Sequence, residues 1–291
     1  MKKLLLIVFI WLGSLSLYSD YSIDQPTTSI DINGVSIAYT SAGEKDDPPV
    51  LMIMGLMASH KVWGEEIVNG LVDSGYRVIL FDNRDTGESE NLDRLGKPNL
   101  YWKFAMNYLG VNFSSPYTLN DMALDGLGVL DHLDIEKAHI VGASMGGMIA
   151  QTIASGYPER TKSLISIMST TGAPHLSSMS ERNEQNFSNV GEFDRERVHA
   201  YGFYPEAMPR QVTAIMKAGD RSNQVRSIKA STLIQHGIND TLLPPDHGEH
   251  TAELIQGSKL EIYENMGHNL PPEVLPLVIE DMVSFFDGLQ E

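Results

Sequence analysis

The chain has 291 residues, of which 42% are hydrophobic, so it can bury a sizeable core in one large α/β domain or two small ones. Its formal net charge of -17 makes nucleic acid and anionic membrane surfaces poor partners, because the summed field repels polyanions. It contains no cysteine, which excludes disulfides, a thiolate nucleophile and metal sites with cysteine ligands.

The first 19 residues have the pattern of a secretory signal peptide. Lys2 and Lys3 precede an apolar run at residues 4–17, and polar residues begin at Ser19. The run is shorter than the roughly 20 residues that a membrane span needs. We therefore expect export to the periplasm or the exterior, with residues 20–291 as the mature domain. The small-residue pair for cleavage, Ser14 and Ser16, is a poor one, so an uncleaved membrane anchor is the alternative.

The mature chain is predicted to open with a β-hairpin. Residues 29–32 and 35–40 flank Asn33-Gly34, a dipeptide in which both turn positions tolerate a positive φ. Apolar runs and amphipathic stretches then alternate, which is typical of a mostly parallel sheet with crossover helices. The predicted strands are 50–54, 76–81, 138–141, 163–168, 232–235 and 260–263, and the predicted helices between them include 62–72, 119–133 and 145–157.

Two segments interrupt this alternation. Residues 172–228 are polar, contain methionine and carry aromatic residues around Tyr201, so we expect a small cap inserted over the sheet. Residues 96–116 form a smaller excursion that carries Trp102 among several other aromatic residues, and we expect it to lie beside the cap.

The pattern Gly142-Ala143-Ser144-Met145-Gly146 fits the G-x-S-x-G elbow, in which a sharp turn between a strand and a helix exposes a serine oxygen. The motif is short enough to arise by chance, so its context decides. Residues 138–141 form a strand that runs directly into it, and a helix follows directly after it. The pattern therefore predicts that Ser144 is a nucleophile.

A serine hydroxyl needs a base to accept its proton, and in this kind of site the chain order is serine, acid, histidine. Of the nine histidines, only His268 lies in a loop between a late strand and the C-terminal helix. We expect His268 to be the base. Asp240, which follows the preceding strand and a glycine turn, is expected to orient its imidazole.

Other acidic residues and histidines near Asp240 have a different interpretation. Asp246 and Glu249 compete for the role of the acid, but both are expected on the helix that follows. His247, Glu249 and His250 could suggest a metal site, yet one helical turn without further ligands is more typical of a solvated face. The sequence therefore predicts no metal and no cofactor.

Three short patterns, Gly-Ala-Ser-Met-Gly-Gly with Ser144, His-Gly-Ile-Asn-Asp with Asp240, and Gly-His with His268, resemble the α/β-hydrolase superfamily. The resemblance extends from the first hairpin to the C-terminus. Residues 54–59 and 76–87 are similar to the branch that contains aclacinomycin methylesterase. The resemblance implies an eight-stranded, mostly parallel sheet flanked by helices, with a cap inserted before the acid.

The chain departs from the superfamily's pattern in two places. Met54-Gly55 stands where many relatives have His-Gly, and residues 82–85 read Asp-Asn-Arg-Asp where relatives often have Asp-x-Arg-Gly. The oxyanion donors are backbone groups, expected at Leu56 and Met145, so neither change removes one. The bracing of the first loop is in doubt without the histidine. Asp82 and Arg84 are expected to be structural.

These roles predict a serine esterase that cleaves small or moderately apolar carboxylic esters through an acyl-enzyme. Met57, Trp102, Phe203 and Leu243 are candidates for the lining of the substrate pocket, although they could equally be core residues. Amidase, peptidase or cofactor-free perhydrolase activity is the first alternative, and a ligand-binding receptor on the same fold is the second. The sequence indicates neither the natural substrate nor the oligomeric state.

Overall fold

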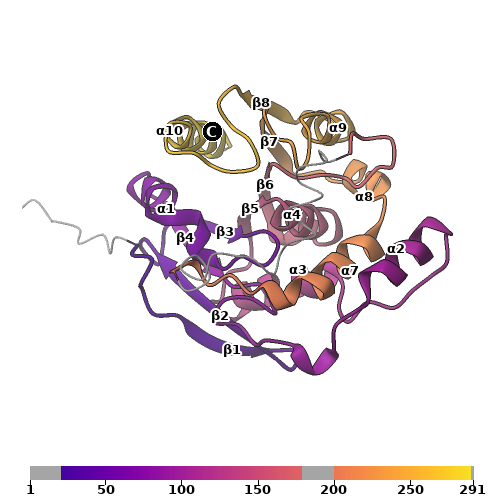
Figure 1. The fold of residues 1–291 in the computed structure, drawn as a ribbon. Helices are drawn as coiled ribbons and strands as arrows, with labels where there is room; N and C mark the ends of the chain where they lie inside the picture. The colour runs from indigo at the N-terminus through magenta and orange to yellow at the C-terminus, as the bar shows by residue number, and fades with distance from the viewer. Residues whose placement is uncertain (1–20, 179–199, 290–291) are drawn as a thin grey trace, which may run out of the picture.

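The computed structural model describes residues 21–178 and 200–289, so the predicted signal peptide lies outside the described part. Eight strands form one sheet in the order β1-β2-β4-β3-β5-β6-β7-β8 (Figure 1). β2 pairs antiparallel with β1 and β4, and all the other pairs are parallel. The predicted mostly parallel, eight-stranded sheet flanked by helices is confirmed.

Strands and helices alternate along the chain much as the apolar periodicity predicts. The strands are β1 (Thr28–Ile32), β2 (Val35–Ala42), β3 (Pro49–Ile53), β4 (Arg77–Phe81), β5 (Ala138–Ala143), β6 (Thr161–Ile167), β7 (Ser231–Gly237) and β8 (Lys259–Tyr263). The α-helices are α1 (Gly64–Asp73), α2 (Leu100–Tyr108), α3 (Leu119–His132), α4 (Met145–Gly156), α7 (Met208–Ala218), α8 (Ser222–Arg226), α9 (Asp246–Leu254) and α10 (Leu275–Asp287). Short 3₁₀ helices cover His60–Trp63, Asp93–Leu95, Pro158–Arg160 and Pro205–Ala207.

The predicted hairpin is present between β1 and β2. Asn33 and Gly34 have φ values of 54° and 77°, and Ile32 pairs with Val35 across the turn. A two-residue turn with positive φ at both positions matches the twist of the strands that it joins.

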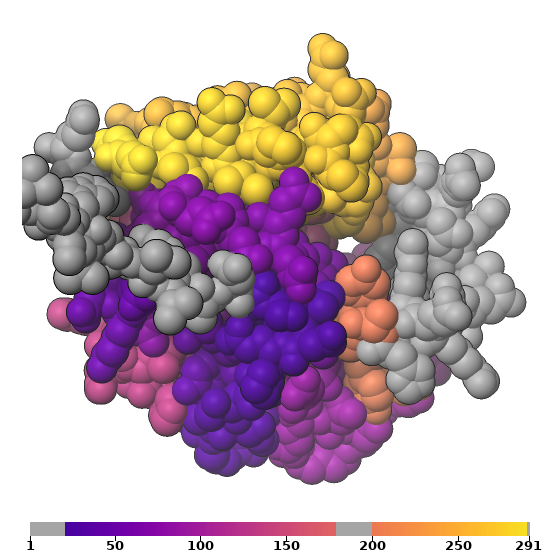
Figure 2. All heavy atoms as spheres, turned by 90° about the vertical axis from the view of Figure 1, so that its left-hand side faces the viewer, coloured from indigo at the N-terminus to yellow at the C-terminus, as the bar shows by residue number. Residues whose placement is uncertain are grey.

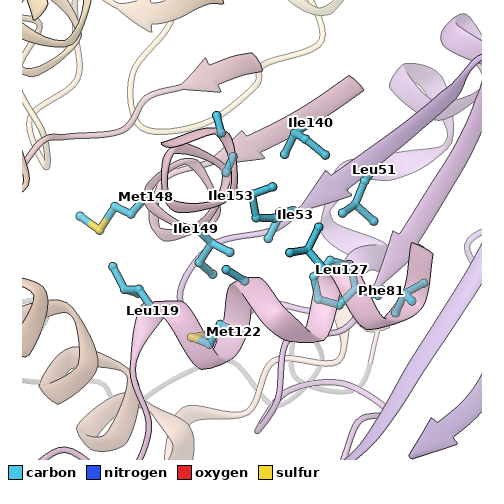
Figure 3. Packing of buried hydrophobic residues seen from close by; sticks show 14 of the residues in the cluster. Leu51, Ile53, Phe81, Leu119, Met122, Leu127, Ile140, Met148, Ile149 and Ile153 are labelled. Carbon is cyan, nitrogen blue, oxygen red and sulfur yellow. The ribbon is translucent and has the colours of Figure 1, made fainter. Parts of the chain in front are cut away.

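Helices cover both faces of the sheet, and each face has its own apolar core. On one face, α3, α4, α8 and α9 pack over side chains such as Leu51, Phe81 and Ile140, as Figure 3 shows for α3 and α4. On the other face, α1 and α10 pack over the sheet, and Figure 2 shows yellow α10 lying against purple α1. The central strands are therefore buried on both sides, as expected for parallel strands.

Between β6 and β7, the described residues 200–228 contribute helices and no strand of the sheet. α7 packs against α2 and α3, and α8 packs against α4 and α9. Residues 179–199 of the predicted cap lie outside the described part. Within residues 21–178 and 200–289, no helix is long and apolar enough to span a membrane.

Candidate active site

Ser144 lies at the tight turn between β5 and α4, with φ 56° and ψ -120°. A positive φ is strained for a residue with a side chain and persists only where the surroundings enforce it. A Cβ on Gly146 would lie 2.0 Å from the carbonyl oxygen of Ile53, and one on Gly142 would lie 2.2 Å from that of Gly146. The glycines of the motif therefore allow α4 to begin against the end of β3.

The structure brings Ser144, His268 and Asp240 together. His268 Nε2 is 2.9 Å from Ser144 Oγ, and His268 Nδ1 is 2.7 Å from Asp240 Oδ2. The three side chains follow the carboxyl ends of β5, β7 and β8, which meet at one edge of the sheet. With Nδ1–H donating to the carboxylate, the lone pair of Nε2 can accept the serine hydroxyl proton.

Asp240 is buried, with 3% of its surface exposed, and is surrounded by donors. Its Oδ1 accepts the backbone N–H groups of Leu242 and Leu243 at 2.9 and 2.8 Å. Burial alone would raise the pKa of Asp240, but hydrogen bonds from His236, His268 and the Leu243 amide outweigh it and hold the pKa well below its usual range. Asp240 is therefore an anion that can orient the ring of His268.

The loops that carry the acid and the base pack backbone against backbone. Asn239 N donates to the carbonyl of Met266 at 3.0 Å. A Cβ on Gly237 would lie 2.2 Å from the same carbonyl, so this approach requires glycine. The competing carboxylates, Asp246 and Glu249, lie on α9, as expected.

The loop after β3 lies beside Ser144. A Cβ on Gly55 would lie 3.1 Å from Ser144 Cβ and 3.6 Å from its Oγ. Leu56 follows in the same loop. Met145 is the first residue of α4, so its N–H has no acceptor within the helix. Leu56 therefore follows a residue that lies against Ser144, and Met145 follows Ser144 directly in the chain.

A family model described as the alpha/beta hydrolase fold matches residues 48–204, which is more than half of the chain. The chain belongs to the α/β-hydrolase fold family.

Two curated relatives of this α/β hydrolase have names that specify different substrates. Rhodomycin D methylesterase from Streptomyces peucetius is 28% identical, over 84% of this chain and 93% of its own length. A 2-hydroxy-6-oxononadienedioate/2-hydroxy-6-oxononatrienedioate hydrolase from Escherichia coli is 28% identical, over 80% of this chain and 84% of its own length. Family membership and both relatives indicate a hydrolase.

A solved structure shows the same fold. A thermophilic esterase from Thermogutta terrifontis superposes with a TM-score of 0.66 and 21% identity, over 92% of this chain and 100% of its own. The predicted resemblance to the superfamily, including its methylesterase branch, is confirmed by these matches.

The four predicted pocket residues of this α/β hydrolase differ in how deeply they are buried. Met57 is buried in the loop after β3, and Leu243 is half-buried beside Asp240. Phe203 is half-buried and packs on the core beneath α1 and α10. Trp102 is 68% exposed on α2. A pocket lined by these side chains stays a prediction.

Residues 82–84, which precede the departure from the superfamily pattern at Asp85, brace the loops around the site. Asn83 Nδ2 donates to the carbonyl of Met54 at 2.7 Å. Asp82 Oδ1 accepts from His60, both from Nδ1 at 2.8 Å and from the backbone N–H at 2.7 Å. Arg84 makes a bidentate ion pair with Asp125 at 2.6 and 2.7 Å. These contacts support the structural role expected for Asp82 and Arg84.

Three residues that the sequence did not single out contact the site or its loops. His236, on β7, has its Nε2 at 2.8 Å from the carbonyl of Leu243 and at 3.4 Å from Asp240 Oδ2. Arg210 and Gln211, on α7, are fully buried. The signal for α7 was present, because Pro209 starts an amphipathic stretch at a position that favours the first turn of a helix.

The histidines of α9 have protein partners. His247 Nδ1 lies 2.6 Å from Thr170 Oγ1, and its Nε2 lies 2.9 Å from the carbonyl of Ser177. His250 Nδ1 lies 2.9 Å from Thr171 Oγ1. Within the part of the chain that the structure describes, no three histidine, aspartate or glutamate side chains are grouped so that they could hold a metal ion.

Proposed function

We propose that this α/β hydrolase is a carboxylic ester hydrolase in which Ser144 is the nucleophile, His268 the general base and Asp240 the residue that orients the base. One observation carries the proposal: a continuous chain of contacts from Asp240 Oδ2 through both ring nitrogens of His268 to Ser144 Oγ, at 2.7 and 2.9 Å. Both distances fall within the range needed for proton transfer.

The reaction follows from this geometry. Ser144 Oγ attacks the ester carbonyl while His268 Nε2 takes its proton, and the resulting imidazolium is stabilised by the Asp240 carboxylate. His268 then returns the proton to the departing alcohol. Water attacks the acyl-enzyme by the same route, releasing the acid and restoring Ser144.

The negative charge that develops on the carbonyl oxygen needs preorganised donors. The N–H groups of Leu56 and Met145 are proposed to supply them, because Gly55 lies against Ser144 and Met145 starts α4. The amino end of α4 adds the positive end of the helix dipole. Removing one such donor typically costs about 10²–10³ in kcat.

The proposed substrates are small or moderately apolar esters. The methylesterase relative supports an ester, and the buried Met57 beside the nucleophile loop would favour an apolar group. We also propose that residues 1–19 direct export. Amide hydrolysis, perhydrolysis and ligand binding without turnover are the alternatives that the experiment below separates.

The test is hydrolysis of p-nitrophenyl esters of increasing acyl length by the purified protein beside Ser144→Ala. We expect turnover in the parent and a loss of at least about 10³-fold in the variant, because the nucleophile is removed. The acyl-length preference would then measure the acyl pocket.

Two further measurements distinguish the alternatives. A fluorophosphonate should label the parent and not Ser144→Ala. A parent that is labelled but cleaves only p-nitroanilides would replace the esterase with an amidase. A parent that is neither labelled nor active, or a Ser144→Ala variant that keeps its rate, would contradict the assignment of the nucleophile.

A further inference from the structure

The loop that presents Leu56 adopts a conformation that its own sequence does not favour. Met57 has φ 62°, in the left-handed region, although it is not glycine. Such a residue costs about 1–2 kcal/mol and needs contacts from outside the loop to hold it. The contacts made by Met57 therefore indicate what fixes the position of the Leu56 amide.

Both backbone polar groups of Met57 bond to the segment between β6 and β7. Its N–H donates to Gln211 Oε1 at 2.7 Å, and its carbonyl accepts the N–H of Tyr204 at 3.0 Å. Next to it, Ser59 Oγ donates to the carbonyl of Tyr201 at 2.5 Å. The loop after β3 is therefore held by residues 201–211 as well as by the sheet.

Hydrogen bonds at both ends of the Gln211 side-chain amide fix its orientation. It is fully buried, and its Nε2 donates to the carbonyl of Arg84 at 3.4 Å while its Oε1 accepts from Met57. The preceding residue, Arg210, forms an ion pair with Asp85 through two nitrogens and contacts Asp93 Oδ1 at 2.9 Å. The start of α7 is thereby fixed against the loop after β4, and the amide of Gln211 with it.

The Met57 N–H and the Leu56 N–H belong to successive peptide units. Fixing the direction of the first restricts the rotation of the second about Leu56, because each peptide is planar and only two dihedral angles lie between them. We propose that Gln211 is a positioning residue: by accepting the Met57 N–H, it aims the Leu56 N–H at the oxyanion. The proposed oxyanion hole then forms only when α7 packs against the loop after β3.

This inference rests on the proposed function, because it gives Gln211 a role only if an oxyanion forms at Ser144. In relatives that have His-Gly before this loop, a histidine stands where this chain has Met54. Here the Met54 carbonyl is held by Asn83, and the next residues are held by Gln211. The structure thus supplies bracing from α7 in a chain that lacks that histidine.

The test is Gln211→Met in the full chain, which removes the acceptor at similar volume. We expect kcat to fall about 10–100-fold with KM within about twofold, because a displacement of about 1 Å at a catalytic group costs about 10²-fold. The affinity for a trifluoromethyl ketone, whose adduct with serine carries an oxyanion, should fall in proportion to kcat/KM. Gln211→Glu keeps an acceptor oxygen and should recover part of the rate.

Gln151→Met is the matched control. Gln151 is also a fully buried glutamine, and its Nε2 donates to Ser166 Oγ on β6 rather than to the loop after β3. We expect Gln151→Met to lower the thermal stability about as much as Gln211→Met does, but to keep the kcat of the parent and its affinity for the ketone.

The outcomes separate the inference from the function it rests on. If the parent turns over esters and Ser144→Ala does not, a Gln211→Met variant with kcat within threefold of the parent overturns the inference alone. Equal losses in kcat for both glutamine variants would also overturn it, because the effect would then follow from stability. A parent without ester turnover overturns the proposed function, and the inference with it.

Discussion

α7 and α2 pack against each other outside the sheet, yet they are held very differently (Figure 1). α7 buries Arg210, Gln211, Thr213 and Ala214. α2 buries none of its nine residues, and Tyr101, Trp102 and Tyr108 are 90%, 68% and 90% exposed. α2 is nevertheless the more apolar helix by composition.

The difference shows that apolar content does not decide which helix belongs to the site. Polar groups fix α7: a buried ion pair with the loop after β4, and a hydrogen bond that Gln211 Oε1 accepts from the Met57 N–H in the loop after β3. The aromatic side chains of α2 lie outside both apolar clusters formed by the described residues. A polar contact specifies one position and orientation, whereas apolar burial specifies only a face.

The largest expected effect comes from breaking the ion pair of α7. Among the described residues, Arg210→Met leaves the buried side chain of Asp85 with Tyr117 Oη and the Leu92 amide as its hydrogen-bond donors. Removing one partner of a buried pair typically costs about 3–5 kcal/mol, and we expect a loss of free energy of unfolding in this range, measured by urea denaturation. The variant should also lose activity, because Gln211 moves with α7.

The matched control is Arg94→Met. Arg94 pairs with Glu90 at 3.2 Å, but the Arg94 side chain is exposed and the Glu90 side chain is partly exposed to solvent. We expect less than about 1 kcal/mol from this pair. Equal losses from the two arginine variants would show that α7 is not held by its buried pair.

The next largest effect is a dependence of stability on pH. We expect it to come from a histidine of the sheet, because neither α2 nor α7 contains a histidine. His139 on β5 packs on Phe286 and bonds to Ser163 Oγ. Burial, aided by the charge of Lys162, lowers its pKa to about 4. The unfolded chain takes up this proton near pH 6.5, so the stability is full above 6.5 and is lost as the pH falls toward 4.

The loss should reach about 2–3 kcal/mol across that window. His139→Gln keeps a polar group beside Ser163 but cannot titrate. The free energy of unfolding, measured in urea at pH 7.5 and 4.5, should therefore change less in the variant than in the parent. An unchanged difference would show that His139 is not the group that titrates.

The smallest effect is expected on α2. Trp102→Ala should change the free energy of unfolding by less than about 0.5 kcal/mol, because the side chain is exposed. Phe113, buried five residues after α2 between Lys103 and Lys217, is the comparison, and Phe113→Ala should cost about 3 kcal/mol. A large loss from Trp102→Ala in a thermal melt would mean that α2 is covered in solution.

The proximity of Ser144, Asp240 and His268 could be predicted because each residue lies in a short local pattern and their chain order is typical of a serine hydrolase site. Ser144 follows a strand and precedes a helix, and Asp240 and His268 each follow a late strand. The sheet could be predicted for a similar reason, since apolar runs of strand length alternate with helical periodicity.

Arg210 and Gln211 could not be predicted in the same way. Their partners, Asp85 and Met57, lie 125 and 154 residues away in the chain, and no local pattern links them. The sequence left residues 172–228 without assigned helices, so the buried face of α7 was not defined. Trp102, a candidate for the pocket lining, lies largely exposed on α2, and its place in a pocket stays a prediction.

The order of the strands has a consequence for biosynthesis. The elbow at Ser144 is built from a strand, a turn and a helix that are adjacent in the chain, whereas its partner His268 lies 124 residues later, beyond the edge strand β8. Domains are made from the amino terminus onward, so the nucleophile leaves the ribosome long before its base. If the triad works as proposed, a nascent chain is inert toward esters until the segment after β8, which carries His268, has joined the fold.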